Sequence, residues 1–428
     1  MLKSNLWRST DYGWWLGADT CSALSDSLVM FAIPLIAMSI TGASGVSSTL
    51  DAMVAFISAM LAIPGGLVQD RYDRRTLMIL SYSLDAAILA IAAVLILFRM
   101  LSVVTLVVIC LLLGVNQGLL GETSNTMLRG VVSNEELPRA MAMNDSRDAI
   151  VSIIGSPVSG ALMGIGKIVP FLGAVAMNIA GVIAALRIKR YWHRGAETNS
   201  SSASKNDGAE EPIPSWRDAF GGLVWLMKVG FQRRLLFISA ISMNGFNVFL
   251  LLTMLDLMQS GMDTARIGLI DSATAVGMLV GAVIVSALID RTRGGVLVAS
   301  CFTLLTFSMI GAAIAEGLWL KCVCLMFAVI GLPAANAAIG GFQSTLIGKD
   351  KMGRAFAGVG LVRDCVYPVL ATMSGWIMQF AGYRTAAVIL IAFETVCLAL
   401  CLTSRPLITL PTPDRWQSHA DRWHLEKF

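Results

Sequence analysis

Apolar residues along this chain gather into runs of about 20 positions, separated by short polar connections. A helix needs a run of about that length to cross the hydrocarbon core of a membrane, since each residue adds about 1.5 Å. The pattern predicts twelve such helices, at residues 12–40, 46–69, 76–98, 101–128, 140–164, 169–188, 234–259, 267–290, 294–315, 318–347, 354–381 and 384–404. We therefore expect an all-α membrane protein with twelve transmembrane helices.

The composition supports a membrane protein, because 56% of the residues are hydrophobic and only 14% are charged. The mean hydropathy is +0.72. A water-soluble fold of this composition would expose far too much apolar surface. The eight cysteines are scattered, mostly in the predicted spans, so neither a disulfide framework nor a metal site is expected.

Several polar residues of the first half return in the same order in the second half. The pairs are Asp51 and Asp271, Asp70-Arg71 and Asp290-Arg291, and Asn116 and Asn336, all 220 positions apart, followed by Arg139 and Arg354, and Ser159-Gly160 and Ser374-Gly375, 215 positions apart. Repeated membrane units of this kind are typical of secondary transporters. The repeat predicts two six-helix bundles related by internal duplication, at residues 1–188 and 234–404.

The longest polar interruption separates these two predicted bundles. Residues 189–233 form a Ser- and Pro-containing stretch that is typical of a flexible cytoplasmic linker. Within it, residues 216–227 predict either a short helix at the inner membrane surface or an ordinary connecting helix. Residues 405–428 are expected to be a loosely ordered cytoplasmic tail.

Basic residues are distributed unevenly between the two sides of the predicted membrane. With the amino terminus inside, the outer loops hold only five of the 32 lysines and arginines, namely Arg99, Lys167, Arg266, Lys321 and Arg384. Cytoplasmic loops are enriched in these residues, so both termini are expected in the cytoplasm. The asymmetry also accounts for the net charge of +4 without nucleic acid. The first apolar stretch is too long and too acidic for a cleavable signal peptide.

The most specific local motif joins the second and third predicted spans. Residues 66–75 read GLVQDRYDRR, which resembles the G-x-L-A-D-R-x-G-R-R/K loop of the major facilitator superfamily. The matching positions are Gly66, Asp70, Arg71, Arg74 and Arg75, and the departures are Val68 and Asp73. The resemblance implies the major facilitator fold and a conformational latch between its halves. The alternative interpretation is a basic cytoplasmic turn.

Further stretches are similar to one group of bacterial exporters within that superfamily. Residues 17–35, 135–144 and 353–356 resemble the drug/proton antiporter group that includes macrolide efflux proteins and the enterobactin exporter. Pro157 and Gly160 lie in a segment similar to the G-P-x-x-G-G antiporter motif, which also fits a helix kink packed through small residues. The resemblance implies efflux across a bacterial plasma (inner) membrane.

One position departs from the proton-coupled members of that group. Their fourth span carries R-x-x-Q-G, whereas here Gly114 stands at the arginine position and Gln117-Gly118 match. Proton coupling must therefore depend on other ionisable groups.

The first span supplies the strongest candidates for coupling. Asp19 and Asp26 are seven residues apart, so they share a helix face. A charge in the bilayer costs at least about 2.5 kcal/mol and is retained for a reason. The resemblance implies that spans one, four, seven and ten line a central cavity, so we expect both residues to bind substrate and protons. The alternative is a structural role in bonding neighbouring helices.

Other polar residues fall in the same four spans and could complete a cavity or bond helices together. They are Asn116, Gln117, Glu122, Asn244, Asn247, Asp256 and Asn336. Asp85 and Glu394 fall in spans three and twelve, at the periphery of the implied fold, and are expected to be structural. The pairs Arg147-Asp148 and Arg363-Asp364 are expected to form ion pairs or to bond to the loop motif.

An enzyme is not predicted. The three histidines lie in polar loop or tail, and neither a catalytic grouping nor a phosphate-binding loop for ATP is present in the sequence. No cofactor is expected. The prediction is a secondary active transporter that uses protons to export a small amphipathic compound, such as a drug, antibiotic or siderophore, by alternating access. The alternatives are an importer or facilitator of a small nutrient and a non-transporting membrane sensor.

Overall fold

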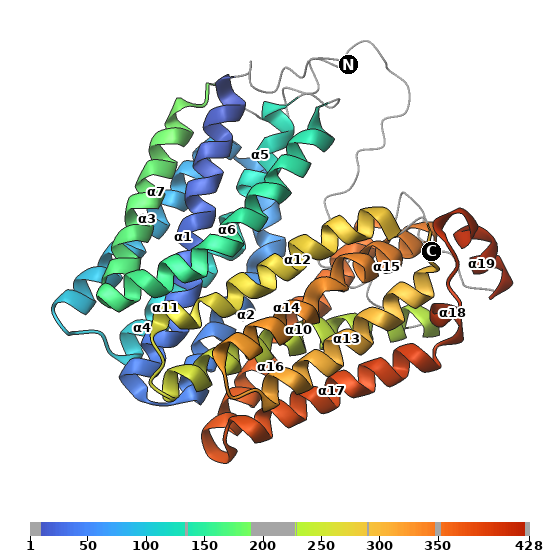
Figure 1. Cartoon of the computed structure of the whole chain (residues 1–428). Helices are drawn as coiled ribbons and strands as arrows, with labels where there is room; N and C mark the ends of the chain where they lie inside the picture. Colours follow the sequence, from blue (N-terminus) through green and yellow to red (C-terminus); the bar gives the residue numbers. More distant parts are fainter. Residues whose placement is uncertain are drawn as a thin grey trace, which may run out of the picture. The chain divides into compact units, whose positions relative to one another are not determined.

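Helices make up all the regular structure in the residues that the computed structural model describes, which are 10–132, 136–189, 227, 229–288, 291–346 and 352–423. The helices of the first half are α1 Thr10–Thr41, α2 Ser44–Arg71, α3 Arg74–Leu97, α4 Val103–Leu120, α5 Thr123–Val131, α6 Leu137–Ile165 and α7 Val169–Arg187. The chain course is shown in Figure 1. The predicted linker helix 216–227 and Asp290 fall outside the described residues, apart from Met227.

The second half carries a corresponding set of helices. They are α10 Gly230–Gln259, α11 Thr264–Ile267, α12 Leu269–Leu288, α13 Gly294–Ile314, α14 Leu318–Ile330, α15 Leu332–Leu346, α16 Met352–Ala381 and α17 Tyr383–Thr403, followed by α18 Arg405–Ile408, the short 3-10 helix η2 Pro413–Arg415 and α19 Trp416–Arg422. Eleven stretches of the described chain are helical, long and apolar enough to cross a membrane. The remaining predicted span, 354–381, corresponds to α16, which has 30 residues and carries Arg363 and Asp364. The predicted all-α membrane fold is confirmed.

Two predicted spans are interrupted by turns. The span 101–128 divides into α4 and α5 at Gly121, and the span 318–347 divides into α14 and α15 at Gly331. A Cβ atom on Gly331 would lie 2.8 Å from Cα of Cys301 in α13. Glycine therefore lets the chain turn while it touches the neighbouring helix.

The chain divides into two compact units, and the division falls inside α2. One unit holds Met1–Gly42 and Met53–Ile213, and the other holds Ala43–Ala52 and Pro214–Phe428. Within the second unit, the first turns of α2 contact α16. Ser44 Oγ donates to the carbonyl oxygen of Gly375 at 3.2 Å, and the amide of Gly45 donates to Gln379 Oε1 at 3.1 Å.

An aspartate of α2 strengthens this contact. The Tyr367 hydroxyl of α16 donates a hydrogen bond to the Asp51 carboxylate. Tyr367 also lies within electrostatic range of Asp271 in α12. The aspartates that correspond in the two sequence repeats are thus both close to one tyrosine.

Close helix contacts through glycine occur in each unit, between the second and fourth spans of the repeat. A Cβ atom on Gly65 of α2 would lie 2.3 Å from the carbonyl oxygen of Gly118 in α4. In the second unit, a Cβ on Gly277 of α12 would lie 2.3 Å from the carbonyl oxygen of Met326, and one on Gly281 would lie 2.2 Å from that of Ile330. Because lipid competes for apolar contacts, close backbone packing holds membrane helices together.

The carboxyl-terminal tail differs from the prediction of loosely ordered chain. Trp416 of α19 belongs to a buried cluster with Phe342, Leu346, Leu410 and Ala420. Its indole Nε1 donates to the carbonyl oxygen of Pro411 at 3.1 Å. The three prolines of the tail favoured the prediction, but the apolar side chains between and after them are buried, and this burial orders the tail.

The amino-terminal helix is fixed by a buried aromatic cluster. Tyr12 and Trp15 of α1 are fully buried, and their rings stack at 6.0 Å between centroids. The Trp15 indole donates to the carbonyl oxygen of Ser124 in α5 at 3.0 Å. This contact sets the position of α1 one turn before Asp19.

Replacing Gly65 with alanine is expected to weaken the first unit by about 1–3 kcal/mol, because the added methyl group would overlap the α4 backbone. Thermal unfolding of the purified protein in detergent would measure the loss.

Gly66 offers a matched control, since a Cβ atom there would meet nothing within 4 Å. The Gly66→Ala variant should be as stable as the parent or slightly more stable, because alanine favours helix. Equal stability of the two alanine variants would show that the α2–α4 contact contributes nothing.

Candidate functional site

The polar side chains of α1 differ in burial, since some pack against a neighbouring helix and others are exposed. Ser25 is 1% exposed and accepts a hydrogen bond of 2.7 Å from Nδ2 of Asn178 in α7. The next residue, Asp26, is exposed. The Asp19 side chain, two turns earlier, is 13% exposed. The helix therefore uses Ser25 for packing against α7, while Asp19 and Asp26 lie within electrostatic range of each other.

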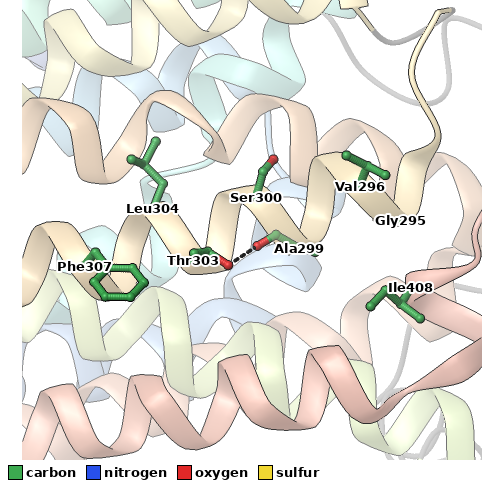
Figure 2. A pocket seen from close by; sticks show the side chains of 8 residues that line it. All are labelled: Gly295, Val296, Ala299, Ser300, Thr303, Leu304, Phe307 and Ile408. Carbon is green, nitrogen blue, oxygen red and sulfur yellow. Dashed lines mark hydrogen bonds between the residues drawn. The ribbon is translucent and has the colours of Figure 1, made fainter.

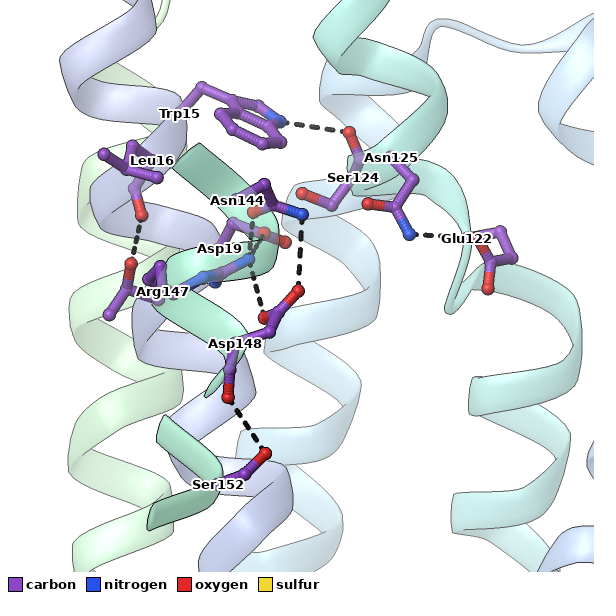
Figure 3. A network of polar contacts seen from close by, with 11 residues as sticks. Trp15, Leu16, Asp19, Glu122, Ser124, Asn125, Asn144, Arg147, Asp148 and Ser152 are labelled. Carbon is purple, nitrogen blue, oxygen red and sulfur yellow. Dashed lines mark hydrogen bonds and ion pairs between the residues drawn. The ribbon is translucent and has the colours of Figure 1, made fainter. Parts of the chain in front are cut away.

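Arg147 of α6 is the partner of Asp19. Its Nη2 atom donates to an oxygen of Asp19 and to Oδ1 of Asn144, and it lies 3.0 Å from Oδ1 of Asp148. Asn144 Nδ2 and Asp148 Oδ2 lie 3.5 Å apart. Asn144 lies one turn before the consecutive residues Arg147 and Asp148, so the three side chains gather beside Asp19 of α1, as Figure 3 shows. The predicted Arg147–Asp148 ion pair is present, and Asp19 extends it.

The guanidinium of Arg147 retains donors that these partners do not use. The Arg147 side chain is 12% exposed, and its Nε and Nη1 atoms are buried without a hydrogen bond to the described residues. A buried donor without a partner costs about 1–3 kcal/mol. The arrangement is therefore suited to receive an additional oxygen acceptor.

The structure explains why no arginine occupies position 114. A Cβ atom on Gly114 would lie 3.0 Å from the carbonyl oxygen of Val54 and 3.1 Å from Cβ of Ile57, both in α2. Packing of α2 on α4 leaves no space for a long side chain there. The cation of this site comes from α6 instead.

A second carboxylate pair extends the site toward α3. Asp26 lies within electrostatic range of Asp85 in α3 and of Asp19. Asp85 in turn interacts with the Asn116 amide. The sequence predicted a peripheral, structural role for Asp85, whereas the structure places it in the same group as Asp26.

Asn116 itself serves helix packing. It is 4% exposed, and its Nδ2 donates to the carbonyl oxygen of Ser81 at 3.0 Å. The other α4 candidates lie elsewhere. Gln117 is exposed, and Glu122 precedes α5 and accepts a 3.0 Å hydrogen bond from Asn125. Neither contacts Asp19 or Arg147 in the described hydrogen-bond network.

The candidates of the second unit are dispersed. Asn244 is 5% exposed, and its Nδ2 donates to the carbonyl oxygen of Arg363 at 2.7 Å, which joins α10 to α16. Asn247 is half-buried and Asn336 is exposed. Asp256 lies near the end of α10, where Lys321 and Arg384 are its electrostatic partners. These positions favour helix packing for Asn244 and electrostatic stabilisation by two cations for Asp256.

Two further charges of the second unit are buried. Lys321, which the sequence placed in an outer loop, is 5% exposed, and its Nζ lies 5.1 Å from the centre of the Tyr383 ring. Glu394 is 2% exposed and accepts a 3.0 Å hydrogen bond from Ser242. The contact between Ser242 and Glu394 joins α10 to α17, as expected for a structural residue.

The loop motif bonds several helices of the first unit together. Asp70 and Arg74 form an ion pair of 3.6 Å. Arg74 Nη1 donates to the carbonyl oxygen of Thr126 in α5 at 2.8 Å, and Arg75 donates to the last carbonyl oxygens of α7. Arg71 is exposed. A Cβ atom on Gly66 of the motif would meet nothing within 4 Å, whereas its neighbour Gly65 makes the close contact with α4.

Asp73, at the position where the family motif has glycine, begins α3. Its Oδ2 atom accepts a 2.9 Å hydrogen bond from the amide of Thr76, which is the usual role of an aspartate before the first turn of a helix. The departure from the motif therefore has a local structural reason.

The remaining predicted positions lie on α6 and α16. Pro157 is inside α6, and Gly160 is buried. Between them, Ser159 Oγ donates to the carbonyl oxygen of Leu28 in α1 at 2.7 Å. Arg363 and Asp364 form the predicted ion pair at 3.2 Å, with side chains 59% and 45% exposed.

Sequence reasoning missed two members of the site. Asn144 binds the Arg147 guanidinium, and its position one turn before Arg147 was the available signal. Tyr82 of α3 is 5% exposed and lies within electrostatic range of Asp19 and Asp26. A tyrosine in an apolar span carries no distinctive pattern, so only the fold could reveal it.

Comparison with known families gives a match over nearly the whole chain. The family described as Major Facilitator Superfamily matches residues 16–255 and 235–423. A search of curated proteins gives no match.

Two solved structures share the fold at low sequence identity. One is described as a bacterial homologue of the iron transporter ferroportin in its inward-facing state, with a TM-score of 0.69, 15% identity, and coverage of 92% of this chain and 98% of that one. The other is a POT family transporter in complex with 5-aminolevulinic acid, with a TM-score of 0.68, 12% identity, and coverage of 93% and 96%. At these identities the likeness shows the fold alone.

The Asp19–Arg147 contact predicts a specific pattern in a double-mutant cycle. Arg147→Gln should destabilise the purified protein by about 3–5 kcal/mol, because it leaves the Asp19 charge buried without a cation. Adding Asp19→Asn to that variant should recover part of the loss. Chemical unfolding in detergent would measure all four corners of the cycle.

Arg363→Gln is the control for charge loss alone. Its ion pair with Asp364 is exposed, so the expected change is below about 1 kcal/mol. Additive effects of Asp19→Asn and Arg147→Gln would contradict a direct interaction between the two side chains.

Proposed function

Since the chain belongs to the Major Facilitator Superfamily and is a membrane transporter of that type, we propose that it exports a small amphipathic compound in exchange for protons. The two halves of the chain would alternate access to a binding site between the two sides of the membrane. The family match and the multi-pass helical fold support transport. Proton coupling and direction are the proposed part.

The observation that carries the proposal is the group of carboxylates around one arginine in the first unit. Asp26 is exposed and lies within electrostatic range of Asp85 and Asp19. Like charges in a region of low dielectric favour binding of a proton by one of them. In this proposal Asp26 carries the proton. The negative charge of Asp85 favours that protonation, and it does so less strongly when water reaches the two carboxylates.

Arg147 links α6 to the carboxylates of α1. The guanidinium is held by Asp19, Asn144 and Asp148. Proton uptake at Asp26 would change the charge within electrostatic range of Asp19, and so the strength of the contact between Asp19 and the guanidinium. A proton arriving at α1 would thereby act on the contact between α1 and α6, which is what coupling requires.

The charges of the site favour a class of substrate. Asp19, Asp26, Asp85 and Asp148 stand against the single cation of Arg147, so a cationic or neutral compound is favoured over an anion. The unused donors Nε and Nη1 of Arg147 would bind a carbonyl or ether oxygen of the compound. An amphipathic drug or antibiotic with a basic group satisfies both conditions.

The direction follows from the proposed location. The uneven distribution of Lys and Arg supports a chain with both termini in the cytoplasm, and the resemblance to exporters supports a bacterial inner membrane. The proton gradient there points inward, so exchange drives the compound outward.

Import is the second candidate, because one structure of similar fold is that of a transporter with 5-aminolevulinic acid bound. Neither that compound nor the iron named for the ferroportin homologue is assigned to this chain. An importer would raise the cellular level of its substrate when the chain is expressed.

The proposal is tested by accumulation of cationic dyes and antibiotics in efflux-deficient bacteria that express the chain. We expect lower accumulation, restored by a protonophore. Asp26→Asn should reduce proton-dependent export at least about tenfold at equal protein level, since it removes the proposed proton carrier.

Asp364→Asn is the matched control, because its carboxylate is exposed on α16 and pairs only with exposed Arg363 in the described ion pairs. Export by this variant should be near normal. Raised accumulation would favour import instead. Normal export by the Asp26→Asn variant, or export that the protonophore does not reduce, would overturn the proposed coupling.

A further inference from the structure

A shallow groove runs along the outer face of α13 in the second unit. It is lined by Gly295, Val296, Ala299, Ser300, Thr303, Leu304 and Phe307 of α13 and by Ile408 of α18, and its volume is about 590 Å³. Figure 2 shows these side chains following α13, with Ile408 near the Gly295 end. The lining residues of α13 form two adjacent rows in which each residue is four positions from the next, so together they make one stripe along the helix.

The groove presents an apolar surface despite its two hydroxyl groups. Thr303 Oγ1 donates to the carbonyl oxygen of Ala299 at 2.8 Å, and Ser300 Oγ donates to that of Leu297 at 3.0 Å. Both hydroxyl protons are thus used within α13. Val296 and Phe307 are 52% and 66% exposed. A hydrocarbon chain satisfies such a surface without leaving polar groups unpaired.

The length of the groove matches one leaflet of a bilayer. From Gly295 to Phe307 the helix rises about 18 Å, at about 1.5 Å per residue. Half of a hydrocarbon core of about 30 Å is about 15 Å. An acyl chain that enters at the Gly295 end would therefore follow the whole stripe and end near Phe307.

The Gly295 end of the groove carries basic residues. Arg293 precedes α13 by one residue, and Arg405 begins α18, one turn before Ile408. Gly295, near the start of α13, packs closely against the carbonyl oxygen of Ile408 at the end of α18, so the two arginines lie on neighbouring segments. Both arginines are exposed, and neither forms an ion pair with the residues that the structure describes. The sequence predicts that this end faces the cytoplasm.

We propose that this groove binds an anionic phospholipid of the cytoplasmic leaflet. One acyl chain lies along α13 from Gly295 to Phe307, and the phosphate is bound by the guanidinium groups of Arg293 and Arg405. Arginine suits this role because its planar donors match phosphate oxygens. Basic pockets at the cytoplasmic side of transmembrane helices bind anionic lipid headgroups by the same chemistry.

The test compares phosphatidylglycerol with phosphatidylcholine of identical acyl chains, added to the delipidated full-length protein in detergent. Native mass spectrometry would count bound lipids, and thermal unfolding would report stabilisation. We expect at least about fivefold tighter binding of phosphatidylglycerol. Arg293→Gln/Arg405→Gln should abolish that preference, whereas Ser300→Trp, which fills the groove, should weaken binding of both lipids.

Two control variants keep the result specific. Arg99→Gln/Arg422→Gln removes two exposed charges elsewhere, and Val388→Trp adds a ring on the exposed face of α17. Both should bind phosphatidylglycerol as the parent does. Equal affinity for the two lipids, or a preference unchanged in Arg293→Gln/Arg405→Gln, would overturn the proposal. Stabilisation by inorganic phosphate alone would also overturn it, by showing an anion site without a lipid chain.

Discussion

The need to give every buried charged group a partner is the constraint on which this structure depends. Hydrocarbon offers no water to a charged or polar group, so each must find its partner inside the protein. Asp19 of α1 forms an ion pair with Arg147 of α6. Glu394 of α17 accepts a hydrogen bond from Ser242 of α10, and the Lys321 ammonium lies over the ring of Tyr383. These contacts each join two helices or lie between them, so removing one partner disturbs the packing of the helices that it joins.

The sequence predicted the elements of the fold well, because the length of an apolar run is itself a physical requirement of a membrane span. It also predicted the internal repeat. In the structure, the repeat is seen in the matching close glycine contacts of α2 with α4 and of α12 with α14. The tail was predicted wrongly. Proline content indicated loose chain, whereas the burial of Trp416 against Phe342 orders the segment.

The candidate site was predicted in part. Asp19 and Asp26 could be found because charges are rare in apolar spans, but the partners of these residues could not. Lipid and protein interior are both apolar, so the hydropathy of a membrane helix does not reveal which face meets which neighbour. The sequence therefore places Asp85 at the periphery, and it predicts an ion pair of Arg147 with Asp148 or a bond to the loop motif but not the contact with Asp19.

The ordered tail has a practical consequence for observing motion. Trp416 and Leu410 attach α19 to α15 and α13, so the end of the described chain moves with the second unit and not independently of it. A fluorophore attached beside Trp423 would consequently report the orientation of a whole helical bundle. Time-resolved polarisation from that single label could then follow rotation of this bundle without any modification inside the membrane.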